Sequence, residues 1–122
     1  MSDPFFDSNI VIDWLNRQPK AKAELLRYKR HRISRIVWTE VLAGEELEDR
    51  DAVQQVISAF EVVEIDSRIA LAAADIRHRT TMKLMYASIL ATAQVNGAIL
   101  ITRNTKDFPV QMPGIRVPYT LP

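Results

Sequence analysis

Three carboxylates from distant parts of the chain each follow a short apolar stretch. They are Asp7, Glu40 and Asp107, and the stretches before them cover residues 5–6, 33–37 and 98–102. If these stretches are parallel strands, their carboxyl ends share the edge of the sheet where ligands bind. Carboxylates gathered there repel one another and need a cation, and oxygen ligands select Mg²⁺ or Mn²⁺. The pattern therefore predicts a metal-assisted phosphodiesterase site, because such a cation activates water and stabilises charge on a phosphodiester.

The same positions also suit helix caps. A carboxylate at the start of a helix accepts hydrogen bonds from free backbone N–H groups and complements the helix dipole. Position alone therefore leaves open whether each acid is a metal ligand or a cap.

The elements that must position these acids are short strands alternating with helices. Strands are predicted at residues 5–6, 33–37, 62–65, 98–102 and 115–117, the last as an edge strand. Helices are predicted at residues 10–15, 20–30, 51–60, 67–79 and 87–95, and a further helix begins at a Thr39 cap. Ser8 or Asn9 is expected to cap the first helix, and Asp66 or Ser67 the helix at 67–79. This alternation predicts one domain over residues 1–122, with three α/β/α layers around a central, mainly parallel sheet of four to five strands.

The composition excludes several classes of site. The chain contains no cysteine, which removes disulfides, thiolate zinc sites and cysteine nucleophiles. Its net charge of +1 argues neither for nor against nucleic acid. The apolar runs are far shorter than the ~20 residues that span a bilayer, and no signal peptide is visible, so we expect a cytoplasmic protein without membrane contact.

Three motifs at the predicted site resemble those of a known family. Residues 5–13 read FFDSNIVID, residues 39–44 read TEVLAG, and residues 99–108 read ILITRNTKDF. In this order they resemble the motifs of PIN domains, most closely those of VapC-type toxins, and their span covers nearly the whole chain. The resemblance implies metal ligation by Asp7, Glu40 and Asp107. It also implies that Asn9, Thr102 and Asn104 support the site through hydrogen bonds.

The resemblance carries expectations about activity and partners. It implies a Mg²⁺-dependent RNA endonuclease toxin that cuts a structured RNA such as tRNA or rRNA. It further implies a homodimer and a cognate VapB-type antitoxin whose peptide lies across the active-site groove. Contact with operator DNA is expected only indirectly, through the antitoxin.

The third family motif departs from its pattern at Tyr86. The family pattern is roughly Lys-Leu-Pro-Asp-Ala, whereas residues 83–87 read Lys-Leu-Met-Tyr-Ala, and no Asp or Glu lies between Asp75 and Asp107. A neutral phenol with an ordinary pKa of ~10 is a poor Mg²⁺ ligand. We therefore expect catalysis to be impaired or absent. The sequence leaves open whether Tyr86 is a natural divergence or an inactivating change, and it also suits a packing residue at a helix start.

Basic residues gather between positions 17 and 35. If part of this segment faces the acids, it can hold the RNA backbone electrostatically; otherwise it is a solvated helix face. The candidate substrate contacts are Arg103, Lys106, Arg30 and Arg32.

Two other functions compete with a nuclease. The first is a catalytically dead binding module that acts through antitoxin binding and operator-DNA autoregulation, and Tyr86 favours it. The second is a receiver-like phosphoacceptor domain. It is disfavoured because receivers need a lysine at a strand end, whereas Lys106 lies in a predicted loop.

Overall fold

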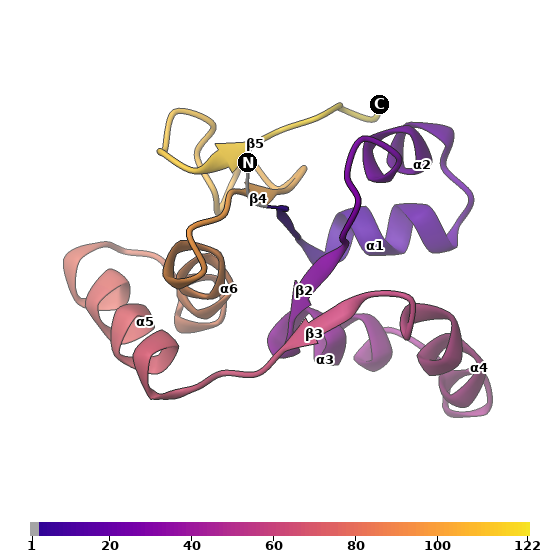
Figure 1. The fold of residues 1–122 in the computed structure, drawn as a ribbon, viewed down its shortest axis with the longest axis horizontal. Coiled ribbons are helices and arrows are strands. Elements are labelled where there is room, and N and C mark those ends of the chain that lie inside the picture. The colour runs from indigo at the N-terminus through magenta and orange to yellow at the C-terminus, as the bar shows by residue number, and fades with distance from the viewer. Residues whose placement is uncertain (1–2) are drawn as a thin grey trace.

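The computed structural model describes residues 3–122 and confirms the three-layer α/β/α fold (Figure 1). The strands are β1 (Phe5–Phe6), β2 (Arg32–Ser34), β3 (Glu61–Val63), β4 (Leu100–Ile101) and β5 (Ile115–Arg116). The helices are α1 (Ser8–Leu15), α2 (Pro19–Leu25), α3 (Arg35–Ala43), α4 (Leu47–Ile57), α5 (Ser67–Arg79) and α6 (Leu84–Val95). The five strands are parallel and run in the order β3-β2-β1-β4-β5, so β5 is an edge strand as predicted.

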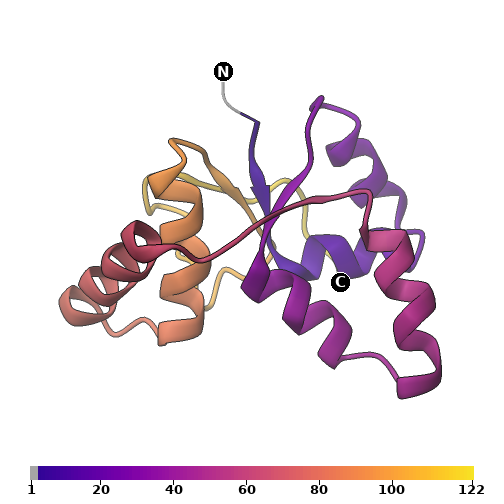
Figure 2. The same ribbon diagram turned by 60° about the horizontal axis from the view of Figure 1, so that its bottom comes forward.

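The strand order creates a switch point between β1 and β4. From β1 the chain moves outward to β2 and β3, and it then returns through α5 and α6 to β4, on the other side of β1. Figures 1 and 2 show α5 and α6 on one side of the sheet, with α1, α2 and α4 on the other. The residues that follow β1 and β4 therefore stand at the position where open parallel sheets bind ligands.

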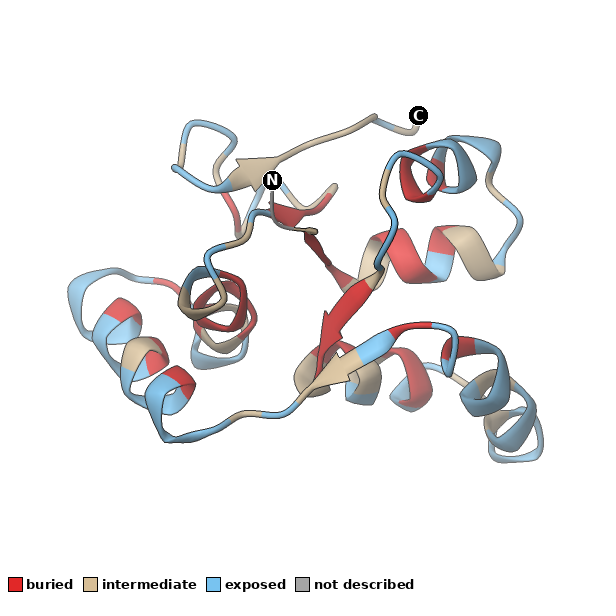
Figure 3. Cartoon of the chain, in the orientation of Figure 1, coloured by how far each residue is buried: buried red, intermediate tan, exposed pale blue. Residues whose placement is uncertain are grey.

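Helix α6 forms the apolar centre of its layer. Its buried residues are Ala87, Ile89, Leu90, Ala91, Thr92 and Ala93. The helix packs against α5, and Figure 3 shows it as a largely buried element. A helix with apolar residues all around is stable only when it is covered on several sides, as predicted here. Gly97, at a φ of 63°, supplies the left-handed residue beyond its end.

The prediction for residues 33–37 is wrong in its second half. The strand stops at Ser34, whose hydroxyl accepts a hydrogen bond from the Val37 N–H at 3.1 Å and so begins α3. Thr39 is therefore not a cap; its hydroxyl donates to the Arg35 carbonyl within the helix, at 2.8 Å. A local side-chain bond to the backbone outweighs the β-branched character of this stretch. As a consequence, Glu40 lies within α3 rather than at its start.

Other element bounds shift by a few residues. Asp7, rather than Ser8 or Asn9, caps α1, while Asp66 caps α5 as predicted. Helix α2 ends at Leu25 instead of near residue 30, and α4 covers Leu47–Ile57 instead of 51–60. Within residues 3–122, every helix is too short or too polar to cross a bilayer.

Candidate active site

Asp7 is the hub of a polar network at the switch point. Its side chain is almost fully buried, and Oδ2 accepts hydrogen bonds from the Thr102 hydroxyl at 2.7 Å and from Asn9 Nδ2 at 3.1 Å. Oδ1 accepts the Ser8 N–H at 2.8 Å, which caps α1. Asp7 is thus a cap and a site residue at once. Burial raises the pKa of the Asp7 carboxyl above its ordinary value, and these hydrogen bonds oppose that shift.

The loop after β4 is tied to this hub through two asparagines. Asn9 Oδ1 accepts the Arg103 N–H at 3.0 Å, and the Thr102 hydroxyl accepts the Asn104 N–H at 2.9 Å. Asn104 Nδ2 then donates to Asp107 Oδ2 at 3.0 Å, and Asn104 Oδ1 accepts the Asp107 N–H at 3.2 Å. The structure therefore joins the three predicted supporting residues to Asp7 and Asp107 in one chain of hydrogen bonds.

Glu40 approaches Asp7 from α3. Its Oε1 atom is buried and has no hydrogen-bond partner among residues 3–122. Burial raises the pKa of the Glu40 carboxyl, and the charge of Asp7 raises it further. A buried polar atom without a partner is costly, and two acids that disfavour each other's ionisation are the situation a cation relieves.

Tyr86 lies in the first turn of α6, half-buried and close to all three acids. Burial raises the pKa of its hydroxyl, and the charges of Asp107, Glu40 and Asp7 add to that shift. The ring packs edge-on against Phe108, with 5.4 Å between centroids. The phenol is therefore neutral at pH 7, and it brings a bulky packed group where the family motif has a carboxylate.

The acids present fit a divalent cation in part. Within residues 3–122, no three His, Asp or Glu side chains gather closely enough to form a metal-binding group. The predicted ligand set of Asp7, Glu40 and Asp107 is thus not assembled as one compact cluster, and Asp107 is not among the charges that shift the pKa of the other two. The pair Asp7 and Glu40, with the unpartnered Glu40 oxygen, does fit Mg²⁺, which is commonly bound by one or two carboxylates and several waters.

The predicted substrate contacts Arg30 and Arg32 do not reach this site. Both lie at the amino end of β2, whereas the acids follow the carboxyl ends of the strands. Arg30 forms an ion pair with Glu61 at 2.7 Å. Arg32 is buried, donates to the Asp3 carbonyl and lies 4.5 Å from the Phe5 ring centre. Both arginines therefore lie at the opposite edge of the sheet from the acids, and the structure does not bring them to the candidate site.

Arg103 lies beside the site, but its guanidinium forms hydrogen bonds with Asp13. It donates to both oxygens of Asp13, at 2.6 and 2.9 Å, and the Tyr119 hydroxyl donates to Asp13 at 2.7 Å. Sequence reasoning missed this network. The available signal was Asp13 itself, an acid on an otherwise apolar first helix. Lys106 remains exposed next to Asp107.

Comparisons with known proteins agree with this fold. The PIN domain profile matches residues 5–110, and this chain belongs to the PIN domain family. A toxin–antitoxin complex from Klebsiella pneumoniae contains a similar chain, with 36% identity, a TM-score of 0.89 and coverage of 98% of this chain and 100% of that one. The predicted resemblance to PIN domains is thereby confirmed, and the similar chain belongs to a toxin–antitoxin complex.

More distant structures share the fold. DNA-bound VapBC from Salmonella typhimurium contains a chain with 23% identity and a TM-score of 0.79, covering 98% of each chain. FitAcB from Neisseria gonorrhoeae contains one with 20% identity and a TM-score of 0.77, covering 95% of this chain and 98% of that one. A search of curated protein sequences finds no match.

Replacing Glu40 with Gln is expected to stabilise the metal-free protein at pH 7. The raised pKa means that the folded state holds protons the unfolded state has lost, so stability falls as pH rises above the ordinary value of 4.5. We expect Glu40→Gln to add about 1 kcal/mol at pH 7, as removal of a functional acid commonly does, and nothing at pH 4. Thermal unfolding with a chelator at both pH values measures this. Asp75→Asn, at an exposed acid of α5, is the control. A loss of stability at pH 7 from Glu40→Gln alone contradicts the argument.

Proposed function

We propose that this chain is the toxin of a toxin–antitoxin pair, built on a VapC-like, Mg²⁺-dependent RNA endonuclease site whose cleavage is impaired by Tyr86. The observation that carries the proposal is the pair formed by the buried Asp7 and the half-buried Glu40, whose Oε1 atom has no partner among residues 3–122, at the switch point of a PIN domain chain. The relative from Klebsiella pneumoniae, which comes from a toxin–antitoxin complex, supports the biological setting.

The residues divide the work of such a site between binding and orientation. Asp7 and Glu40 would hold Mg²⁺, which would activate water and stabilise charge on the phosphodiester. Asn9 and Thr102 fix the Asp7 carboxylate through its Oδ2 atom. Asn104 holds Asp107 at the other end of the network through Oδ2, and the other Asp107 oxygen, which has no side-chain partner among residues 3–122, can accept a hydrogen bond from water.

The same geometry explains the expected impairment. The family pattern supplies an acid at the position of Tyr86, and a neutral phenol offers neither the charge nor the second oxygen of a carboxylate. Its ring also fills space near Asp7, Glu40 and Asp107. The test is cleavage of total RNA by the purified chain, with Mg²⁺ and with chelator. We expect slow cleavage or none, and rapid Mg²⁺-dependent cleavage contradicts the proposed role of Tyr86.

A second function is favoured by Tyr86 alone. In this proposal the protein cuts no RNA and acts as a binding module, held by its antitoxin and reaching operator DNA only through it. The DNA-bound relative from Salmonella typhimurium supports such an assembly. Co-expression with the product of a neighbouring small gene, followed by an operator-binding assay of the pair, tests it. A failure of the two chains to copurify contradicts it.

We also propose a homodimer, formed through α5 rather than through α6. The alanine-rich stretch 87–93 of α6 is buried within the domain and is unable to meet a partner. Leu71 on α5, which is 71% exposed, remains available. We expect light scattering to give twice 13.9 kDa, and Leu71→Lys to shift the mass toward the monomer. Leu26→Lys, at an equally exposed leucine beyond α2, is the matched control. A monomer at high micromolar concentration contradicts the proposal.

A further inference from the structure

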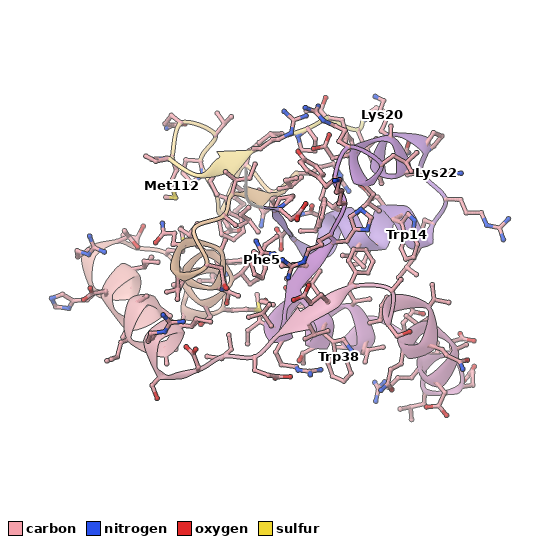
Figure 4. All side chains as sticks on the ribbon, viewed as in Figure 1. Phe5, Trp14, Lys20, Lys22, Trp38 and Met112 are labelled. Carbon is pink, nitrogen blue, oxygen red and sulfur yellow. The ribbon has the colours of Figure 1, made fainter. Side chains whose placement is uncertain are left out.

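A cleft opens beside Asp107, on the side of the molecule formed by α5 and α6. One wall is the connection between these helices, with Thr80, Thr81 and Lys83; the other is the loop after β4, with Lys106, Asp107 and Pro109. Its volume is about 280 Å³. Met112, labelled in Figure 4, also lines it and lies just before β5. Because Asp107 belongs to both, the cleft continues directly from the candidate active site.

The cleft carries more positive than negative charge. Lys83 and Lys106 are both exposed, and within residues 3–122 neither forms an ion pair. Asp107 is the acidic residue that lines the cleft, and its Oδ2 atom already accepts a hydrogen bond from the Asn104 side-chain amide. Helix α6 begins at Leu84 beside the cleft, with no acid in its first turn and no side-chain cap, and its dipole adds to the positive potential. The two ammonium groups are therefore free to bind an anion.

The larger basic segment is poorly placed for the same task. Arg30, just before β2, is paired with Glu61 of β3, and Arg35, at the start of α3, is paired with Glu64, just after β3. Lys20 and Lys22, labelled in Figure 4, lie on α2, on the opposite side of the view from Met112. Within residues 3–122, Lys83 and Lys106 are thus cations without an ion pair that share the cleft with Asp107.

We propose that Lys83 and Lys106 bind the phosphate next to the scissile one in a single strand of RNA. The inference rests on the proposed function, since it takes RNA as the substrate. A phosphodiester drawn into the acidic site is repelled by Asp7 and Glu40, and a neighbouring phosphate held by two lysines offsets that repulsion. The volume of the cleft is slightly below the range of about 300–1,000 Å³ for small-molecule pockets, which suits one nucleotide of a single strand rather than a duplex.

The experiment is RNA binding without cleavage. A fluorescently labelled single-stranded RNA is titrated with the full chain in chelator, and anisotropy is recorded over a range of salt concentrations. The variants are Lys83→Gln, Lys106→Gln and the double variant. Lys29→Gln is the matched control, because Lys29 is also exposed but lies before β2, away from the cleft.

We expect the double variant to bind at least about tenfold more weakly than the control at ~0.1 M salt. The slope of log affinity against log salt should fall by up to ~0.7 for each phosphate of a single strand that the protein no longer neutralises. Thermal unfolding should be unchanged, since both lysines are exposed. Binding by the double variant that equals the control overturns the inference, and so does a parent chain that binds no RNA.

The outcomes separate this inference from the proposed function. If the double variant loses RNA binding while no form of the chain cleaves RNA, the result supports RNA binding in the cleft and contradicts the nuclease function. If a cleaving form retains full activity and RNA affinity after both lysines are replaced, the result supports the nuclease function and contradicts RNA binding by the two lysines.

Discussion

Changing Tyr86→Asp is expected to produce Mg²⁺-dependent RNA cleavage that exceeds that of the parent chain by several orders of magnitude. The substitution restores an anionic ligand close to Asp7, Glu40 and Asp107, and it removes the ring from the space near them. Groups that act as a unit in catalysis lose most of their effect when one is absent, so returning the missing one recovers a large factor. Expression of the variant without antitoxin should also slow growth of the host.

The assay compares both proteins on total RNA, with Mg²⁺ and with chelator. Asp7→Asn in the Tyr86→Asp background is expected to abolish cleavage, because it removes the central carboxylate while leaving a side chain of the same shape. Tyr86→Asn in the parent chain separates the two causes, since it removes the ring without supplying a carboxylate charge. Equal cleavage by the parent and the Tyr86→Asp protein refutes the inactivation argument, and no cleavage by either favours the binding module.

Restoring the acid has an expected cost in stability. Burial and the charge of Asp7 already raise the pKa of Glu40, and a fourth carboxylate adds further repulsion. The Tyr86 ring also no longer packs edge-on against Phe108. Mg²⁺ should recover part of that stability, because a ligand that binds only the folded state stabilises it. Thermal unfolding of the Tyr86→Asp protein with and without Mg²⁺ therefore reports metal binding independently of cleavage.

The sequence predicted the parts of the fold that depend on strong local patterns. The apolar run before Asn96-Gly97 and the capped helix at 67–79 both appear where expected, because burial and caps act within a few residues. The region around Ser34 shows the limit. Its β-branched residues favour a strand, yet one hydroxyl begins a helix there, and this moves Glu40 into the helix.

The site was predictable to the extent that motifs encode it. Asp7, Asn9 and Thr102 meet as expected, since the first motif and the last motif follow neighbouring strands. The partner of Arg103 was not predictable, because Asp13 is ninety residues earlier in the chain and only the packing of α1 against the last loop brings them together. An arginine beside an acidic motif suits substrate binding equally well until its partner is seen.

The ion pair of Arg103 with Asp13 gives the largest expected effect on stability. Asp13 is buried, and its carboxylate receives two bonds from Arg103 and one from the Tyr119 hydroxyl. Burial and that donation hold the pKa of Tyr119 well above its ordinary range, so the phenol remains a donor. Removing one partner of a buried pair leaves the other charge uncompensated, which costs far more than the pair itself contributes.

Arg103→Met is therefore expected to lower the free energy of unfolding by about 3 kcal/mol. For a chain of this size we expect a fall in Tm of roughly 10 °C. Arg68→Met, at an exposed arginine 3.8 Å from Asp66, is the matched control and should change stability by less than ~0.5 kcal/mol.

The double variant Asp13→Asn/Arg103→Met shows whether the loss of stability in Arg103→Met comes from the unpaired charge of Asp13 or from lost packing. It buries no unpaired charge and keeps an oxygen for Tyr119, so it should recover a large part of the stability that Arg103→Met loses. A double variant as unstable as Arg103→Met shows that packing of the Arg103 side chain, rather than its charge, holds the loop. The backbone N–H of Arg103 donates to Asn9, which ties the loop to Asp7. A loop that loses the Arg103–Asp13 ion pair should therefore loosen the Asp7 network as well. In the Tyr86→Asp background, Arg103→Met should lower the rate of cleavage.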